Sequence, residues 1–239
     1  MKLIYEGKAK QIFTTTKDDE IIVRYKDDAT AGNGAKKGTI VNKGILNNRI
    51  TSLIYRYLMS QGIKTHLIKV VNDRDQLCKK VDIFPLEVIV RNVIAGSAAA
   101  RFKLPEGTTV SQPIMEICWK DDNLGDPLIN DSHAVAFNLA TQEELDYIYA
   151  QTKIINEAMI KMWLDMGIKL IDFKIEFGKT SDGEIILADE ISPDTCRLWD
   201  AKTNKKLDKD RFRKDLGNVE DAYIEICNRL EAKLAAKEV

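Results

Sequence analysis

Alternating charged residues in the C-terminal half are the pattern in this sequence that most strongly indicates chemistry: LIDFKIEFG, followed by ILADE. Asp172, Lys174 and Glu176 occupy every second position, so on a β-strand their side chains share one face. The Asp-Gly pair at 182–183 is typical of a two-residue hairpin turn. A hairpin closed by that turn places Glu176 directly opposite Asp189.

Two facing carboxylates at these positions need a positive charge between them. At ~5 Å and an effective dielectric of about 20 they repel by ~3 kcal/mol. A hard divalent ion that carries the phosphates of a nucleotide is the best candidate for that charge. The alternative interpretation is a hairpin face whose carboxylates point into water. A register shift of one residue would also move Asp189 to the opposite face.

Two lysines near the N-terminus could meet the same phosphates. In YEGKAK, Lys8 and Lys10 lie two positions apart, and small neighbours let a phosphate approach the backbone. The alternative is a pair of solvated lysines on an edge strand. A glycine-dense loop, DATAGNGAKKG, follows at 28–38; such loops bind phosphates in some proteins and simply connect elements in others.

A second group of residues suits a monophosphate. Arg91 lies at the end of an expected strand, and Ser97 opens an expected helix, whose first turn offers free amides and a hydroxyl. The alternative is an ordinary serine cap beside a surface arginine. Arg197 could reach the acidic face of the hairpin or form an ion pair with Asp194 or Asp200.

The elements that must position these residues are mostly strands in the first part of the chain. Strands are expected at 11–14, 20–25, 66–71 and 77–82. Apolar residues at helical spacing between Leu46 and Leu58 predict one helix among them. Neither a dinucleotide-binding glycine fingerprint nor a Walker A sequence occurs.

Helices are more prominent in the second part. A strand is expected at 86–91, and Thr141 with Glu144 forms a capping box that opens a long helix. A last helix begins near Asn218. This order of elements predicts an α+β fold, with a β-rich N-terminal domain at 1–85 and an α+β domain at 86–239.

Composition narrows the class of protein. The net charge of −1 creates no global field for nucleic acid or anionic membranes, and no apolar run approaches the ~20 residues of a membrane span. The N-terminus is too polar for a secretory signal. No CxxC pair occurs among the four cysteines, which predicts a reduced, cytoplasmic setting without structural zinc. Cys196 is interpreted as a packed thiol and His133 as an ordinary polar residue.

Seven segments in order along almost the whole chain resemble the phosphoribosylaminoimidazole-succinocarboxamide synthase (SAICAR synthetase) family of purine biosynthesis. They are YEGKAK, DATAGNGAKK, PLEVIVRNVIAGSAAARF, WKDDNLGDPLIND, LIDFKIEFG, LADEISPDTCRLWD and LDKDRFRKDLG. The resemblance implies a homodimeric ligase with a kinase- or ATP-grasp-like N-terminal lobe and an ATP cleft between the lobes. One departure is Asn33, which stands where some family members carry Asp.

The resemblance also implies the reaction. The family joins L-aspartate to the carboxylate of 5-amino-1-(5-phospho-D-ribosyl)imidazole-4-carboxylate and cleaves ATP to ADP and phosphate. A carboxylate resists attack by an amine until its oxygen becomes a leaving group, so an acyl phosphate is the expected intermediate. Amine attack before phosphoryl transfer is the alternative order. Metal ions and lysines neutralise charge on the transferring phosphoryl group.

Carried over by motif, the family roles divide into two sets. For ATP and Mg²⁺, the resemblance implies carboxylates at Glu176 and Asp189, phosphate contacts at Lys8 and Lys10, and adenine contacts at Lys120, Val81 and Ile83. For the imidazole nucleotide and the catalytic step, it implies Arg91, Ser97, Lys174, Arg197 and Arg213, with Asp172 close by.

Two other functions compete with the ligase. A small-molecule kinase would use the same cleft and stop at phosphoryl transfer. A regulatory module would bind magnesium–ATP without forming any product.

Overall fold

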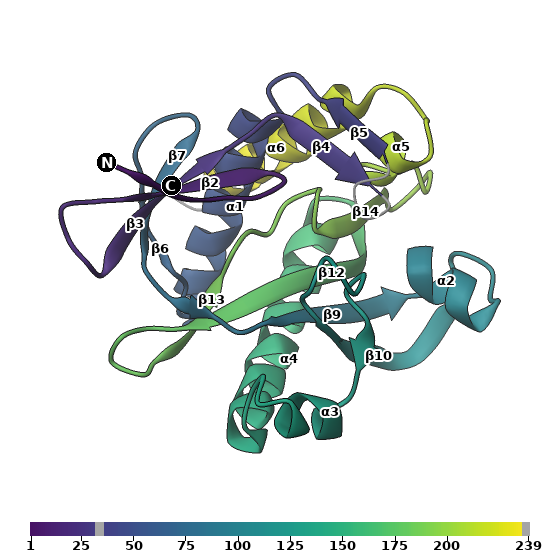
Figure 1. The fold of residues 1–239 in the computed structure, drawn as a ribbon. Coiled ribbons are helices and arrows are strands. Elements are labelled where there is room, and N and C mark those ends of the chain that lie inside the picture. The colour runs from purple at the N-terminus through teal and green to yellow at the C-terminus, as the bar shows by residue number, and fades with distance from the viewer. Residues whose placement is uncertain (32–35, 236–239) are drawn as a thin grey trace.

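Two antiparallel sheets carry the residues of interest in the computed structural model, which describes residues 1–31 and 36–235 (Figure 1). Gly32, Asn33 and Gly34 of the glycine-dense loop lie outside these ranges. The first sheet has the strand order β1-β2-β3-β7-β6. Its strands are β1 (Leu3–Glu6), β2 (Lys10–Thr14), β3 (Glu20–Tyr25), β6 (Leu67–Val70) and β7 (Asp75–Lys79).

The second sheet is built around one long strand, β12. The strand order is β11-β10-β9-β12-β13, and β14 and β8 also pair with β12. Its strands are β8 (Asp82–Ile83), β9 (Leu86–Val93), β10 (Thr109–Trp119), β11 (Leu128–Ile129), β12 (Ile168–Lys179), β13 (Ile185–Ala188) and β14 (Cys196–Asp200). A small hairpin joins β4 (Asp28–Ala31) to β5 (Lys36–Thr39).

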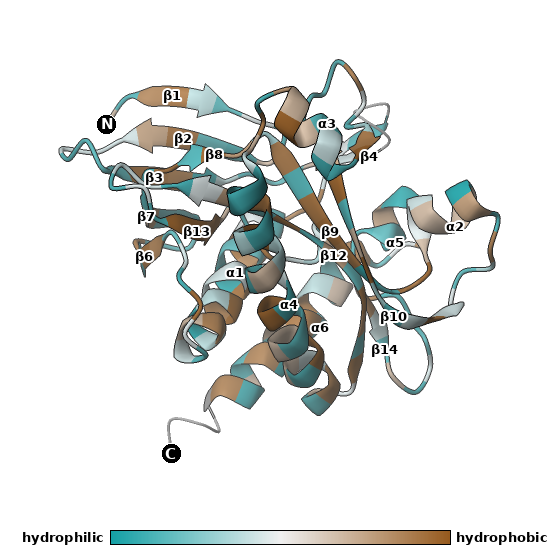
Figure 2. Ribbon diagram, turned by 90° about the horizontal axis from the view of Figure 1, so that it is seen from below, coloured by the Kyte–Doolittle hydropathy of each residue, from teal (hydrophilic) through white to brown (hydrophobic). Residues whose placement is uncertain are grey.

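Three long helices lie on one side of the two sheets, and α1 packs against α6 (Figure 2). The long helices are α1 (Lys43–Ser60), α4 (Gln142–Asp165) and α6 (Val219–Ala235), and the short ones are α2 (Gly96–Phe102), α3 (Asp131–Ala136) and α5 (Asp210–Arg213). The capping box that opens α4 is confirmed, since Thr141 accepts a hydrogen bond from the Glu144 amide and Glu144 accepts one from the Thr141 amide. Among the described residues, none forms a helix long and apolar enough to cross a bilayer.

The α+β class is therefore confirmed. One hydrophobic core extends through both parts of the chain, because buried residues of α1 such as Ile54 belong to the same cluster as Tyr223 of α6. The two-residue strand β8, at the expected domain boundary, pairs with β12 of the second sheet. The division at residue 85 stays a prediction.

The register of the β12–β13 hairpin differs by one residue from the expected one. Glu176 pairs with Ala188, so the expectation that it lies opposite Asp189 is wrong. The Thr180 amide donates to the Glu184 carbonyl and the Gly183 amide to the Thr180 carbonyl, which leaves a three-residue loop at 181–183. Gly183 alone in that loop has a left-handed backbone (φ 86°), whereas a two-residue type I′ turn needs two such residues.

Candidate active site

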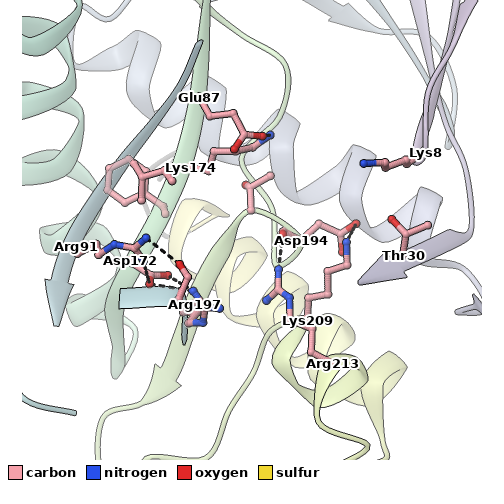
Figure 3. A pocket seen from close by; sticks show the side chains of 14 residues that line it. Lys8, Thr30, Glu87, Arg91, Asp172, Lys174, Asp194, Arg197, Lys209 and Arg213 are labelled. Atoms are coloured by element: carbon pink, nitrogen blue, oxygen red, sulfur yellow. Dashed lines mark hydrogen bonds and ion pairs between the residues drawn. The ribbon is translucent and has the colours of Figure 1, made fainter. Parts of the chain in front are cut away.

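Two adjoining cavities contain the residues that the sequence singled out. The larger one, about 920 Å³, lies between β1–β3 of the first sheet and β8, β12 and the 120–126 segment of the second part. The smaller one, about 310 Å³, lies over β9, β12 and β14 (Figure 3). Lys174, Asp194 and Lys209 line both cavities, so a molecule in one could react with a molecule in the other.

Lysines hold the carboxylates of the larger cavity. Glu176 is buried, and its two oxygens bind the ammonium groups of Lys174 (2.8 Å) and Lys120. Lys10 binds Asp189 and lies 3.1 Å from Glu190. Burial raises the pKa of Asp189, but Lys10, Lys174 and Lys120 outweigh it and hold the pKa well below its usual range. The Asp189 carboxylate is therefore charged.

The direction of the Asp189 side chain does not follow from the alternation of side chains along a strand. Asp189 comes directly after the end of β13 and has a left-handed backbone (φ 61°). This conformation turns the chain, and both Asp189 and Glu176 line the same cavity although they are not cross-strand partners. The two carboxylates therefore line one cavity, although the expected cross-strand pairing is wrong.

The chemistry of these donors suits a magnesium ion that arrives with a nucleotide. Mg²⁺ is usually bound by one or two carboxylates together with phosphate oxygens and water. Within the described part of the chain no group of three or more acidic, His or Cys side chains is arranged to hold a metal by itself. Glu176 and Asp189 would supply the carboxylates, and the lysines that now pair with them could turn to the phosphates.

The opposite part of the larger cavity is apolar and adjoins the short strand β8. Val81 and Ile83 line it together with Ile12, Ile21 and Val23. A side chain at Gly178 would approach the Val81 side chain to 2.4 Å, so glycine permits the close packing of this edge. The Lys120 ammonium group binds Glu176, on the carboxylate side of the cavity.

Lys8 and Lys10 do not lie on one strand, although they are only two positions apart. β2 begins at Lys10, and Lys8 lies before it in the chain. The Lys8 ammonium group reaches 2.6 Å from Asp122, across the mouth of the larger cavity, whereas Lys10 is mostly buried and faces Asp189. Both lysines line the larger cavity, but from different directions.

Two arginines hold the Asp172 carboxylate in the smaller cavity. The Arg91 guanidinium is only 2% exposed and donates to Glu116 (2.8 Å), Asp172 (3.2 Å) and the Ser97 hydroxyl (3.1 Å). Arg197 binds Asp172 from the other side at 2.9 Å (Figure 3). Burial raises the pKa of Asp172, and the two guanidinium groups act in the opposite direction. Arg91 is thus fully engaged and presents Ser97 to the cavity.

Asp210 anchors two cationic side chains that line the smaller cavity. Its carboxylate is fully buried and binds Arg197 (3.0 Å) and Arg213 (2.7 Å). Arg197 therefore does reach the acidic face of the hairpin, while the alternative pairing with Asp194 or Asp200 is wrong. A side chain at Gly96 would come within 2.2 Å of the Arg197 guanidinium, so this glycine makes room for it.

Sequence reasoning missed several residues that line the cavities. Asp194 forms a buried ion pair with Lys43 (2.7 Å), accepts a hydrogen bond from Tyr223 (2.6 Å) and lies 3.8 Å from Lys209. These partners are far apart in the chain, and no local spacing indicates them. Glu190 is different, since its position directly after Asp189 was a visible signal.

The comparisons with known proteins agree with this arrangement. A family model described as SAICAR synthetase matches residues 3–230. A phosphoribosylaminoimidazole-succinocarboxamide synthase of Fusobacterium nucleatum is 65% identical, over 97% of this chain and 98% of that protein. The crystal structure of the synthase from Ehrlichia chaffeensis (47% identity) covers 97% of this chain and 99% of its own, with a TM-score of 0.95.

A further solved structure similar to this chain contains a nucleotide. A SAICAR synthetase in complex with ADP is 46% identical and covers 95% of this chain and 96% of its own, with a TM-score of 0.92.

Proposed function

The chain belongs to the SAICAR synthetase family, and from that premise we propose how its two cavities divide the reaction between them. The enzyme is an ATP-dependent ligase that joins L-aspartate to the carboxylate of the imidazole ribonucleotide in purine biosynthesis, with release of ADP and phosphate. In our proposal, ATP occupies the larger cavity and the imidazole nucleotide the smaller one. Lys174 lies at their junction, where the γ-phosphoryl group meets the carboxylate.

The polarity of the larger cavity supports the ATP assignment. Its apolar wall around Val81 and Ile83 suits an adenine ring, and the backbone of 81–84 offers an edge for it. Lys8, Lys10 and Lys120 would face the phosphates. A relative of the same fold was solved with ADP, which agrees with this assignment.

Glu176 and Asp189 would hold the Mg²⁺ ion that accompanies ATP. When bound, the ion withdraws negative charge from the transferring phosphoryl group. Around it, the ammonium groups of Lys10 and Lys174 are already directed at the two carboxylates, so each can move to a phosphate oxygen without leaving the cavity. The two lysines thereby balance the carboxylates before ATP binds and the phosphates during phosphoryl transfer.

The smaller cavity suits a phosphorylated and carboxylated ligand. Arg197, Arg213 and Lys209 line it, and Arg91 orients the Ser97 hydroxyl toward the same space. We assign the ribose phosphate to this cationic and hydroxyl group. Asp172 binds two guanidinium groups, so we assign it to fixing their positions rather than to proton transfer.

The catalytic step proposed at Lys174 follows from its contacts. Burial lowers the pKa of Lys174, but Glu176, Asp189 and Glu87 outweigh it and raise the pKa above its ordinary value, so the side chain stays an ammonium ion. Its positive charge between the two cavities stabilises the phosphoryl group as it leaves ADP and forms an acyl phosphate. The aspartate amine then displaces phosphate from the activated carbonyl carbon.

The position of Lys174 at the junction of the two cavities is the observation that carries this proposal. A coupled assay for ADP tests the reaction. ADP should appear only when ATP, the imidazole nucleotide and L-aspartate are all present, together with the succinocarboxamide product by mass spectrometry. Equal ADP release without aspartate would instead indicate a kinase, and binding of magnesium–ATP without any product would indicate a regulatory module.

We also propose that the enzyme is a cytoplasmic homodimer. The four cysteines are free and buried in the structure, which suits a reducing compartment. The family resemblance supports the dimer. Light scattering after gel filtration should give twice the chain mass of 27.1 kDa, and a mass of one chain would contradict the proposal.

A further inference from the structure

The turn that carries Asp189 and Glu190 is bound from behind by two hydroxyl groups of helix α1. The Tyr55 hydroxyl donates to the Ala188 carbonyl at 2.7 Å. The Thr51 hydroxyl donates to the Ile191 carbonyl at 3.1 Å. These two carbonyls flank the acidic pair on either side, so α1 holds the turn at both ends.

The geometry of α1 explains why two side chains can do this together. Thr51 and Tyr55 lie four residues apart on a helix, which places them on the same face one turn apart. Both side chains are fully buried, and buried hydroxyls and carbonyls are almost always paired. The Tyr55 ring also packs edge-on against His66, and the backbone amide of His66 donates to the Leu187 carbonyl at 2.8 Å.

The turn needs such support because Asp189 has a left-handed backbone (φ 61°). Residues other than glycine adopt this conformation uncommonly, and they keep it where the surroundings determine it. Any relaxation toward an extended backbone would redirect the Asp189 carboxylate and the adjacent Glu190, both of which now face Lys10. The orientation of the acidic pair therefore depends on what holds residues 188 and 191.

We propose that Tyr55 and Thr51 are positioning residues of the ATP site, which fix the 188–191 turn so that Asp189 and Glu190 face Lys10 and the phosphates. The proposal rests on the proposed function of the larger cavity. Neither Thr51 nor Tyr55 lines either of the two described cavities, so each acts through the turn and not on the ligand. Their removal should weaken nucleotide binding and leave the smaller cavity unchanged.

The experiment uses variants that remove one hydroxyl and keep the bulk of the side chain. Tyr55→Phe and Thr51→Val should each weaken magnesium–ADP binding, measured by isothermal titration calorimetry, by about tenfold, because each removes a hydrogen bond that holds one end of the turn. The KM for ATP should rise in parallel, while the KM for the imidazole nucleotide changes by less than about twofold. Thr51→Ser keeps a hydroxyl and should bind nucleotide as the wild type does.

Tyr57→Phe is the matched control. Tyr57 lies on the same helix and its hydroxyl also donates to a backbone carbonyl, but that carbonyl belongs to Ala158 of α4. If Tyr55 had a merely structural role, Tyr55→Phe and Tyr57→Phe would both lower the melting temperature, and the two variants would bind nucleotide with the same affinity. Equal affinities of these two variants for magnesium–ADP would overturn the proposal.

A double-mutant cycle with Asp189→Asn tests the route of action. If Tyr55 acts through the Asp189 carboxylate, Tyr55→Phe should weaken nucleotide binding by less than about twofold in the Asp189→Asn background. A full tenfold loss in that background would contradict the proposal. The Thr51→Val and Thr51→Ser pair carries the same comparison should Tyr55→Phe not fold.

Because magnesium–ADP binding is measured directly, the positioning role is tested separately from the proposed reaction. If the wild type binds magnesium–ADP but forms no succinocarboxamide, the proposed function fails and the positioning of the turn can still be measured. If the product forms and the hydroxyl variants bind nucleotide normally, the positioning role fails alone.

Discussion

The two cavities hold their carboxylates with different cations. In the larger one, Lys10, Lys120 and Lys174 bind Asp189 and Glu176, and lysine is a point charge on a flexible stem. In the smaller one, Arg91 and Arg197 bind Asp172, and their planar groups fix the direction of several hydrogen bonds at once. The larger cavity is thus suited to exchanging partners when a cation and phosphates enter, whereas the smaller one is preformed.

The largest effect should come from Lys174, which is one of the lysines of the larger cavity and lines both cavities. Lys174→Met should lower kcat by about 10³-fold, because a positive charge beside the transferring phosphoryl group is lost. Steady-state assays at saturating substrates measure this. Lys179→Met is the control, since Lys179 lies on the same strand, pairs with Glu144 and lines neither cavity. Similar losses in both variants would remove Lys174 from the site.

Glu176→Gln should lower turnover by at least ~10²-fold. The change keeps the shape of the side chain and removes the charge that binds Lys120 and Lys174, and with it a proposed ligand of the ion. Turnover measured over a series of Mg²⁺ concentrations should show a higher requirement for the metal. Glu184→Gln, directly after the 181–183 loop and outside the lining of both cavities, serves as the control. Near-normal turnover of Glu176→Gln would contradict its role.

Asp210→Asn changes the support of the smaller cavity and should have a smaller effect. Arg197 and Arg213 lose their shared anchor, so the KM for the imidazole nucleotide should rise by about tenfold, which corresponds to ~1.4 kcal/mol. The KM for ATP should stay within about twofold. Equal increases in both constants would mean that the two cavities are not separate in function.

The smallest effect should be on stability, through Glu106, which forms ion pairs with Lys206 and Lys214. Burial raises the pKa of Glu106, but Lys214, Lys206 and the Gly96 amide outweigh it and lower the pKa from 4.5 to about 2. A lowered pKa stabilises the fold above the unfolded-state value and loses that contribution as the pH falls through the folded-state value. Because the side chain is partly exposed, Glu106→Gln should cost at most about 1 kcal/mol at pH 7.

Urea denaturation of the wild type and Glu106→Gln at several pH values measures this contribution. The difference between the two proteins should be full at pH 6–7 and should narrow as the pH falls from about 4.5 toward 2. A difference that grows on acidification would show that Glu106 is not held as a carboxylate by these partners.

Much of the fold was predictable because it depends on local patterns. The strand at 20–25, the capping box at Thr141 and the end of α1 before Gly62 all follow from propensity, caps and periodicity. The shared face of Asp172, Lys174 and Glu176 follows from strand alternation, and the three side chains do line the two joined cavities.

The failures have physical reasons as well. The hairpin register depends on whether the loop has two or three residues, and Asp-Gly suits either. The direction of Asp189 depends on a left-handed residue that α1 supports from a distant part of the chain. The Lys43–Asp194 pair joins residues 43 and 194, which no local spacing relates.

A crystal structure with magnesium–ADP and the imidazole nucleotide bound tests the contrast between the cavities most directly. We expect Glu176 and Asp189 to leave their lysine partners and bind the same cation, with the lysines turned to phosphate oxygens. The Arg91–Asp172–Arg197 arrangement should remain as it is here. A cation bound elsewhere, with the lysine–carboxylate pairs intact, would contradict the account.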